Sequence, residues 1–148
     1  MIHYVSGDMF ARAADVRVNT VNCVGVMGKG IALEFKRRYP AMFLDYKAAC
    51  ERGEVRPGRL HTYGTEECLI VNFPTKIHWR HGSRYDDVRD GLEALRDLLR
   101  PMGKVMITLP ALGCGHGGLD WTRVKNMIEF WLVYVDAEIY VYLPQNSR

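Results

Sequence analysis

The chain has 148 residues, of which 48% are apolar and 25% charged, and its formal net charge is +3. This length and composition predict one globular domain with a sizeable core. The small positive charge is compatible with a phosphate-bearing ligand, but it argues against a dedicated DNA-wrapping surface.

The cysteines and the hydropathy pattern exclude further classes of protein. The four cysteines, at positions 23, 50, 68 and 114, form no CxxC pair and have no metal-ligand spacing. Cys23 and Cys68 stand in apolar, strand-like runs, where we expect small buried hydrophobic side chains. Such cysteines favour a reducing cytosol, and no segment has the pattern of a membrane span or a signal peptide. We therefore predict a cytoplasmic monomer that needs no membrane, metal or other cofactor.

The first predicted strand, Ile2–Val5, ends at Ser6, Gly7 and Asp8. An acidic residue just beyond a strand end has two equally plausible roles. Its carboxylate could accept hydrogen bonds from a ligand amine or hydroxyl, or it could cap the next turn. The sequence leaves both roles of Asp8 open.

The second predicted strand, Val16–Val21, leads into a loop that contains Gly25, Gly28 and Gly30. An apolar helical pattern follows from Ile31 and ends before Pro40. A strand, a glycine loop and a helix together present free backbone N–H groups and the positive end of a helix dipole to an anion. The spacing matches neither standard nucleotide fingerprint, so a tight turn with helix-start glycines fits this loop about as well as a phosphate site.

The rest of the chain continues to alternate between helices and strands. A second helix is predicted over 41–52, and a hairpin over 59–63 and 68–73 turns at 64–67. A helix over 83–100 carries a leucine-rich apolar stripe, and a strand over 104–109 runs into a second glycine-rich loop, 110–119. A helix from about Asp120 and a strand over 138–143 complete the pattern.

This alternation predicts an α/β three-layer sandwich. The loops that carry reactive and ligand-binding residue types, 7–9, 22–30, 74–80 and 110–119, all follow predicted strands. Ligands bind at the carboxyl ends of the strands in such sheets. Each of the two glycine loops leads into a helix, so we expect the two loops to lie on either side of one diphosphate. A phosphate site is therefore a better interpretation of the first glycine loop than a tight turn.

Four motifs follow one another along the chain. They are Gly7-Asp8-Met9-Phe10, Asn19-Thr20-Val21-Asn22 with Gly25 to Ala32, Phe73-Pro74-Thr75-Lys76 with His78-Trp79-Arg80, and Leu112-Gly113-Cys114-Gly115 through Trp121. In this order they resemble the motifs of the macrodomain family, and in particular of macrodomains of the DarG antitoxin type, which are related to the human terminal ADP-ribose protein glycohydrolase. The resemblance covers residues 1 to about 143. It implies a single macrodomain over 1–148 with a mixed, mostly parallel central sheet, and it leaves open that this is the N-terminal domain of a longer antitoxin.

The resemblance implies an enzyme that removes ADP-ribose from thymidine in single-stranded DNA and so reverses the action of a DarT-type toxin. Its expected partners are ADP-ribose, ADP-ribosylated single-stranded DNA and a cognate toxin. Two other classes of function remain open: a non-catalytic ADP-ribose reader, and a hydrolase of ADP-ribosylated protein or of free ADP-ribose derivatives. Lys76 favours catalysis over a reader, and the sequence offers no separate metal site or activated nucleophile for a phosphatase or deacetylase.

The resemblance also implies roles for individual residues. Asp8 would accept a hydrogen bond from the adenine amine, Asn22 would contact the distal ribose, and Lys76 would be catalytic. The two glycine loops would enclose the diphosphate. The full predicted ligand-binding set is Asp8, Met9, Asn22, Gly25, Val26, Met27, Gly28, Lys29, Gly30, Ile31, Thr75, Leu112, Gly113, Cys114, Gly115, His116, Gly117, Gly118 and Leu119.

One position departs from the human relative, which has an acidic residue in the second glycine loop where this chain has Gly117. Asp120 lies three residues further on, directly before a predicted helix. Aspartate is a preferred N-cap residue, so we favour a capping role for Asp120 over a catalytic one. His116 lies in the same loop and could face the ligand.

From its residue type alone, Lys76 is expected to be a solvated charge or a phosphate contact, because most loop lysines are solvated. The resemblance implies instead that Lys76 is catalytic. A lysine becomes nucleophilic when burial or a neighbouring cation lowers its pKa, and Lys29, His78 and Arg80 are candidate neighbours. Pro74 and Trp79 would help to exclude water. The neutral amine could attack the distal anomeric carbon, or the protonated amine could stabilise the departing base. Lys29, His78, Arg80, His81 and Arg84 are the cations expected to meet the phosphates beside the modified base.

Overall fold

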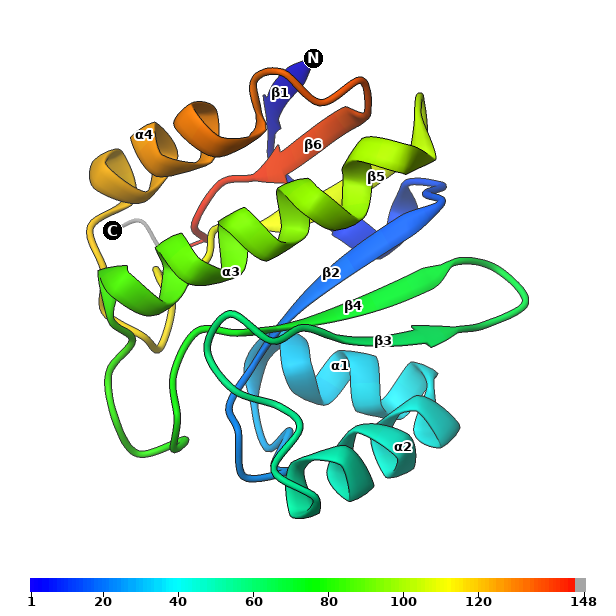
Figure 1. Cartoon of the computed structure of the whole chain (residues 1–148), viewed down its shortest axis with the longest axis vertical. Coiled ribbons are helices and arrows are strands. Elements are labelled where there is room, and N and C mark those ends of the chain that lie inside the picture. The colour runs from blue at the N-terminus through cyan, green and yellow to red at the C-terminus, as the bar shows by residue number, and fades with distance from the viewer. Residues whose placement is uncertain (146–148) are drawn as a thin grey trace.

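A computed structural model describes residues 1–145 and shows a central sheet covered by helices on both faces (Figure 1). The strands are β1 (Ile2–Val5), β2 (Val16–Val21), β3 (His61–Gly64), β4 (Leu69–Pro74), β5 (Met106–Pro110) and β6 (Glu138–Tyr142). The α-helices are α1 (Gly30–Arg38), α2 (Pro40–Glu51), α3 (Tyr85–Leu99) and α4 (Trp121–Leu132), and 3-10 turns lie at η1 (Met9–Ala11) and η2 (Arg100–Met102). The predicted α/β sandwich is confirmed.

The strands lie in the order β1-β6-β5-β2-β4-β3. Every neighbouring pair is parallel except β3 and β4, which form the predicted antiparallel hairpin. The sheet is therefore mixed and mostly parallel. As a result, the carboxyl ends of β1, β6, β5, β2 and β4 all lie at one edge, where the loops that follow them can meet.

Two apolar cores, one on each face of the sheet, fix the three layers. The larger core joins the apolar stripes of α3 and α4 to the sheet, with Leu92, Leu95 and Ile128 fully buried. The smaller core joins α1 and α2 to the other face, and Phe35 and Tyr46 are its largest buried side chains. Parallel strands buried on both faces need such continuous apolar runs.

The helix ends follow the expected physical chemistry. Lys36, Arg37 and Arg38 lie in the last turn of α1, where cations interact favourably with the helix dipole. The side chain of Asp120 accepts a hydrogen bond of 3.1 Å from the backbone N–H of Arg123, so Asp120 is the N-cap of α4, as predicted.

The cysteines differ from the prediction at one position. Cys68 is buried as expected, but Cys23 is half-buried in the loop after β2 instead of lying in a strand. All four cysteines are free thiols. Among residues 1–145, no helix is long and apolar enough to span a membrane, and no group of three or more His, Cys, Asp or Glu side chains is placed to hold a metal ion.

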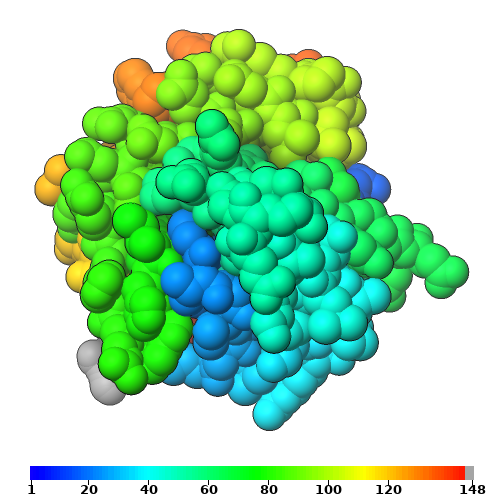
Figure 2. Space-filling model, turned by 60° about the horizontal axis from the view of Figure 1, so that its bottom comes forward, coloured from blue at the N-terminus to red at the C-terminus, as the bar shows by residue number. Residues whose placement is uncertain are grey.

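The loops after β2 and β4 lie side by side at the carboxyl edge of the sheet, the first in blue and the second in green (Figure 2). Their backbones are joined, because the Cys23 N–H donates to the Ile77 carbonyl over 2.8 Å and the Thr75 N–H to the Val21 carbonyl over 3.0 Å. This pairing places Lys76 beside the first glycine loop.

Candidate active site

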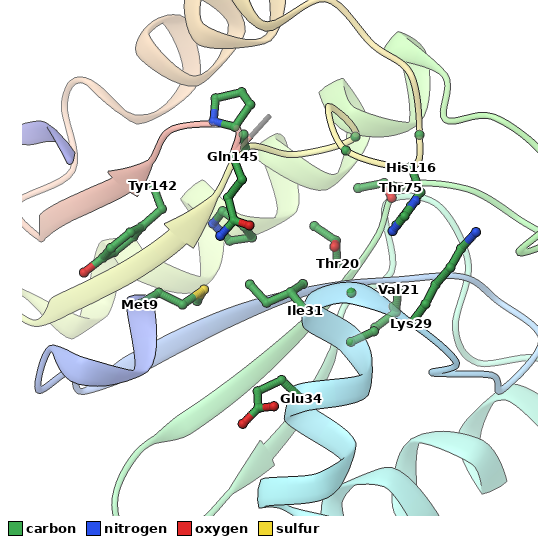
Figure 3. A pocket seen from close by; sticks show the side chains of 18 of the residues that line it. Met9, Thr20, Val21, Lys29, Ile31, Glu34, Thr75, His116, Tyr142 and Gln145 are labelled. Carbon is green, nitrogen blue, oxygen red and sulfur yellow. The ribbon is translucent and has the colours of Figure 1, made fainter. Parts of the chain in front are cut away.

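A cavity of about 750 Å³ opens at the carboxyl edge of the sheet (Figure 3). His116, Thr75 and Lys29 gather at one end of it, and Met9 and Tyr142 lie at the other. Segments that follow all five parallel strands contribute to its wall. The predicted site residues that line it are Asp8, Met9, Asn22, Val26, Gly28, Lys29, Gly30, Ile31, Thr75, Lys76, Gly113, Gly115, His116 and Gly117.

The first wall of the cavity is the start of α1. Lys29 is the N-cap residue and makes no side-chain capping bond, so the first backbone N–H groups of the helix are not capped by its side chain. Gly28, Lys29 and Gly30 all line the cavity, and Gly30 has a φ of +62°, a left-handed conformation that favours glycine. Free N–H groups at the positive end of a helix form an anion site.

Asn22 holds the rest of this loop in shape. Its Nδ2 donates to the Val26 carbonyl over 2.8 Å, and its Oδ1 accepts from the Val24 N–H over 3.1 Å. The buried Tyr46 hydroxyl donates to the Asn22 backbone carbonyl at 2.8 Å and lies 3.0 Å from Oδ1. Asn22 lines the cavity as predicted, but most of its amide is engaged inside the loop and only a small part remains for a ligand.

The second wall is the glycine loop between β5 and α4. The Ser83 N–H donates to the Gly117 carbonyl over 3.0 Å, and the Leu119 N–H to the Gly113 carbonyl over 2.9 Å. A Cβ atom at position 117 would lie 2.2 Å from the Ser83 Oγ and 2.5 Å from the Gly113 carbonyl oxygen. No side chain fits there without a shift of the loop, so the loop has no room for an acidic residue at position 117.

The two walls approach each other at Gly30 and His116. A Cβ atom added to Gly30 would lie 3.4 Å from two atoms of the His116 ring. The start of α1 therefore faces the second glycine loop across the cavity at this point. This arrangement suits an elongated ligand with an anionic centre.

Lys76 lies half-buried at one end of the cavity. Burial, and after it the positive charge of Lys29, lowers the pKa of the Lys76 amine below its ordinary value. Of the three cations predicted to act on Lys76, Lys29 is the one that lowers its pKa.

The cysteines near the cavity are not reactive thiolates. Burial raises the pKa of the Cys23 and Cys114 thiols to about 11, so neither is a ready thiolate nucleophile.

At the opposite end, Asp8 has the predicted capping role and also faces the cavity. Its Oδ1 accepts from the Phe10 N–H over 2.9 Å and caps η1, while the exposed carboxylate also lines the cavity. The Phe10 ring provides a flat surface there. It lies 4.3 Å below the Arg38 guanidinium carbon and meets Phe35 edge-on at 4.8 Å.

The other predicted ligand contacts do not line the cavity, because alternate residues of each loop point inward and anchor it. Met27 and Leu112 are core residues, and Gly25 packs against Lys47 and Cys50. Leu119 packs against Gly113. The predicted residues outside the lining are Gly25, Met27, Leu112, Cys114, Gly118 and Leu119.

The sequence interpretation missed several lining residues. Glu34 and Arg38 lie one and two turns into α1, and Thr20 lies within β2. The segment from Tyr142 to Gln145 at the end of β6 also lines the cavity. Ligands bind at the carboxyl ends of parallel strands, and β6 is parallel to its neighbours. Applying this rule to the last strand would have identified the segment.

Comparisons with known proteins agree with this fold. The family model described as "Macro domain" matches residues 18–128. The DNA ADP-ribosyl glycohydrolase of Thermus aquaticus is 44% identical over 152 residues, which cover 99% of this chain and 42% of that protein. The chain thus spans about two fifths of the length of this curated relative.

Two solved structures are similar in both sequence and fold. The macrodomain of Thermus aquaticus DarG is 44% identical with a TM-score of 0.91, over 97% of this chain and 99% of that chain. Thermosipho africanus DarTG, solved in complex with ADP-ribose, is 31% identical with a TM-score of 0.93. That match covers 99% of this chain and 42% of the other.

Proposed function

This chain belongs to the macrodomain family, and from that premise we propose that it hydrolyses the bond between ADP-ribose and thymidine in single-stranded DNA. The observation that carries the proposal is Lys76, whose pKa is lowered at one end of a cavity walled by an uncapped helix start and a second glycine loop. The 44% identity to DNA ADP-ribosyl glycohydrolases supports the same substrate class.

The cavity fits the chemical groups of ADP-ribose in order. Its volume of about 750 Å³ is within the range of small-molecule sites. The diphosphate lies between Gly30 and His116, beside the start of α1, whose first N–H groups are not capped by the Lys29 side chain. The adenine lies toward Asp8 and Phe10, and the distal ribose toward Lys76. The glycosidic bond then projects out of the cavity beside Lys76.

Lys76 acts as the nucleophile in this proposal. The lone pair of its neutral Nζ forms a bond to the distal anomeric carbon while the glycosidic bond breaks. The electron pair of that bond leaves with the thymine nitrogen, which takes up the proton that Nζ loses as it becomes a secondary amine. Water then delivers hydroxide to the anomeric carbon and a proton to Nζ, which releases ADP-ribose and restores the amine.

A DarT-type toxin is the proposed source of the substrate. One relative, from Thermosipho africanus, carries a DNA ADP-ribosyl transferase and a DNA ADP-ribosyl glycohydrolase in one chain. We propose by analogy that residues 1–148 form a single macrodomain of an antitoxin that acts opposite such a transferase. A cytoplasmic, monomeric state stays a prediction.

The test is single-turnover release of ADP-ribose from thymidine-modified single-stranded DNA, with calorimetry on the same proteins. We expect Lys76→Ala to lower the release rate by orders of magnitude and to leave ADP-ribose affinity nearly unchanged, because a group that acts in the transition state adds little ground-state binding. Near-normal release by Lys76→Ala would contradict the assignment. Binding without any release by the wild type would identify a reader, and release only from modified protein would identify another carrier.

Lys76→Arg separates the two roles of the lysine. Arginine keeps the positive charge but is not a neutral nucleophile at ordinary pH. We expect the arginine variant to be inactive. An active arginine variant would show that the protonated side chain stabilises the departing base instead.

A further inference from the structure

The loop that follows Lys76 carries a row of flat and cationic side chains outside the deep part of the cavity. We name residues 77–82 the Trp79 loop. The ring centroids of His81 and His78 lie 5.4 Å apart, and those of His78 and Trp79 lie 5.2 Å apart. The Arg80 guanidinium carbon lies 4.7 Å from the centre of the Trp79 ring.

Hydrogen bonds hold the Trp79 loop to both glycine loops. At its start the Ile77 carbonyl accepts from the Cys23 N–H, and just beyond its end the Ser83 N–H donates to Gly117. Within it, the His81 N–H donates to the His78 carbonyl over 3.0 Å, and the Arg80 N–H to the His78 Nδ1 over 3.1 Å. These bonds place the loop at the rim of the cavity, between the two glycine loops.

This rim exposes apolar surface. The Trp79 side chain is 40% exposed and that of Ile77 is 52% exposed, and neither residue belongs to one of the two cores. Trp79 also contributes to the cavity wall, so its free surface begins where the cavity ends. A group that leaves the cavity past Lys76 would meet the indole first.

The charge around the rim is positive. Among the described residues, no ion pair joins Lys29 or Arg80 to a carboxylate, and Arg84 lies 3.9 Å from Asp86 at the edge of ion-pair distance. Some other surface arginines have carboxylate partners at short range, for example Arg38 with Glu34 and Arg52 with Glu54. Lys29 and Arg80 therefore place positive charge near the exposed indole without a carboxylate partner among the described residues.

We propose that the Trp79 loop is a platform for single-stranded nucleic acid: the base next to the modified thymidine stacks on Trp79, and Arg80 and Lys29 contact the flanking phosphates. Exposed aromatic rings interleaved with cations are the recognition surface of single strands, because every base has a face that can stack. This inference rests on the proposed function and deepens it, since it names the surface that would recognise the DNA strand beside the modified base.

The experiment compares two substrates that share the ADP-ribose: modified thymidine alone, and a strand of about ten nucleotides with one modified thymidine. We expect Trp79→Ala to raise the KM for the strand relative to the nucleoside by roughly 5- to 150-fold, the range of one lost stacking contact. Trp79→Phe should restore most of this preference. Phe130→Ala removes an aromatic side chain that is 74% exposed on α4, and it should leave the preference unchanged.

An equal rise in KM for both substrates in Trp79→Ala would overturn the proposal, because Trp79 would then contact the ADP-ribose itself. An unchanged KM for both substrates would also overturn it. If the wild type releases ADP-ribose from neither substrate, the proposed function fails, and binding of labelled oligothymidylate at low salt decides about the platform separately. Weaker binding by Trp79→Ala supports the platform in that case, and unchanged or absent binding overturns it.

Discussion

Burial and the charge of Lys29 act on Lys76 in the same direction. Both disfavour the protonated amine, so the pKa of Lys76 is lowered and more of the amine is neutral at a given pH. The rate of ADP-ribose release should therefore rise with pH and level off below the ordinary lysine value of about 10.4. Measuring kcat against pH tests this, and a rate that falls over the same range would indicate that the protonated amine is the active form.

Replacing Lys29 tests the electrostatic part of this effect. Lys29→Gln removes the neighbouring charge, so the Lys76 pKa should rise and the ascending limb of kcat should move to higher pH. The shift should be partial, because burial is the larger cause and stays in place. Lys104→Gln removes an exposed lysine before β5 and should leave the profile unchanged. An unshifted Lys29→Gln profile would mean that burial alone sets the pKa.

The Tyr46 hydroxyl is predicted to stabilise the first glycine loop through Asn22. Tyr46→Phe removes its hydrogen bond and leaves a buried carbonyl without this donor, which should lower the free energy of unfolding by about 1–3 kcal/mol. ADP-ribose affinity should fall as well, because the loop loses its support. Urea denaturation and calorimetry measure the two effects. Tyr134→Phe, at a side chain 94% exposed, is the matched control and should change neither.

Individual site residues were predictable where chemistry and position coincide. Lys76, Lys29 and Asp8 have reactive or polar groups in loops that follow strands, and all three line the cavity. Asn22 shows the limit of such reasoning. Its type fits a ligand contact, but only the three-dimensional structure reveals the carbonyl and hydroxyl groups that engage its amide.

At the scale of the elements, the positions of the second glycine loop differ in how large a side chain they tolerate. A Cβ atom at Gly115 would meet nothing within 4 Å, and Gly115 lines the cavity. Gly115→Leu should therefore fold normally and block ADP-ribose. Gly64→Leu is the matched control, because Gly64 has equally open surroundings at the end of β3 and lies outside the cavity lining.

Calorimetry and thermal unfolding separate these outcomes. We expect no ADP-ribose binding by Gly115→Leu, with a Tm near that of the wild type, and full binding by Gly64→Leu. If Gly115→Leu binds ADP-ribose as the wild type does, the ligand does not pass the second glycine loop. Gly117→Ala offers a contrast: its Cβ would collide with the Ser83 Oγ and the Gly113 carbonyl, so it should lower the Tm itself.

The sequence predicted the type of every strand and α-helix, because the apolar periodicity is strong and glycine or proline marks many ends. Local tertiary bonds shift the boundaries. The helix expected from Ser83 begins at Tyr85, because the Ser83 N–H pairs with Gly117 across the site. The strand expected from Lys104 begins at Met106, because a tight turn brings the Val105 N–H to the Gly103 carbonyl. Neither bond is visible in a local pattern.

At the scale of the whole molecule, charge is distributed unevenly although the net charge is only +3. The helices that cover the sheet carry arginines that are paired along their own surface, such as Arg89 with Asp86 and Arg96 with Asp97. Among the described residues, Lys29 and Arg80 at the cavity and its rim have no carboxylate partner within ion-pair distance. Binding to DNA should therefore involve a few local phosphate contacts near the modified base and no extended basic face.

The dependence of binding on salt concentration measures this distribution. With Lys29, Arg80 and Arg84 as contacts, log affinity for modified single-stranded DNA should fall with log salt at a slope of about −2, because each contact contributes about −0.7. Arg80→Ala should make the slope shallower by about 0.7. Arg100→Ala removes the same charge from a site beside Asp97, away from the cavity, and should leave the slope unchanged. A steep slope on unmodified DNA would instead reveal an extended DNA-binding face, and recognition would then not depend on the ADP-ribose cavity and its rim.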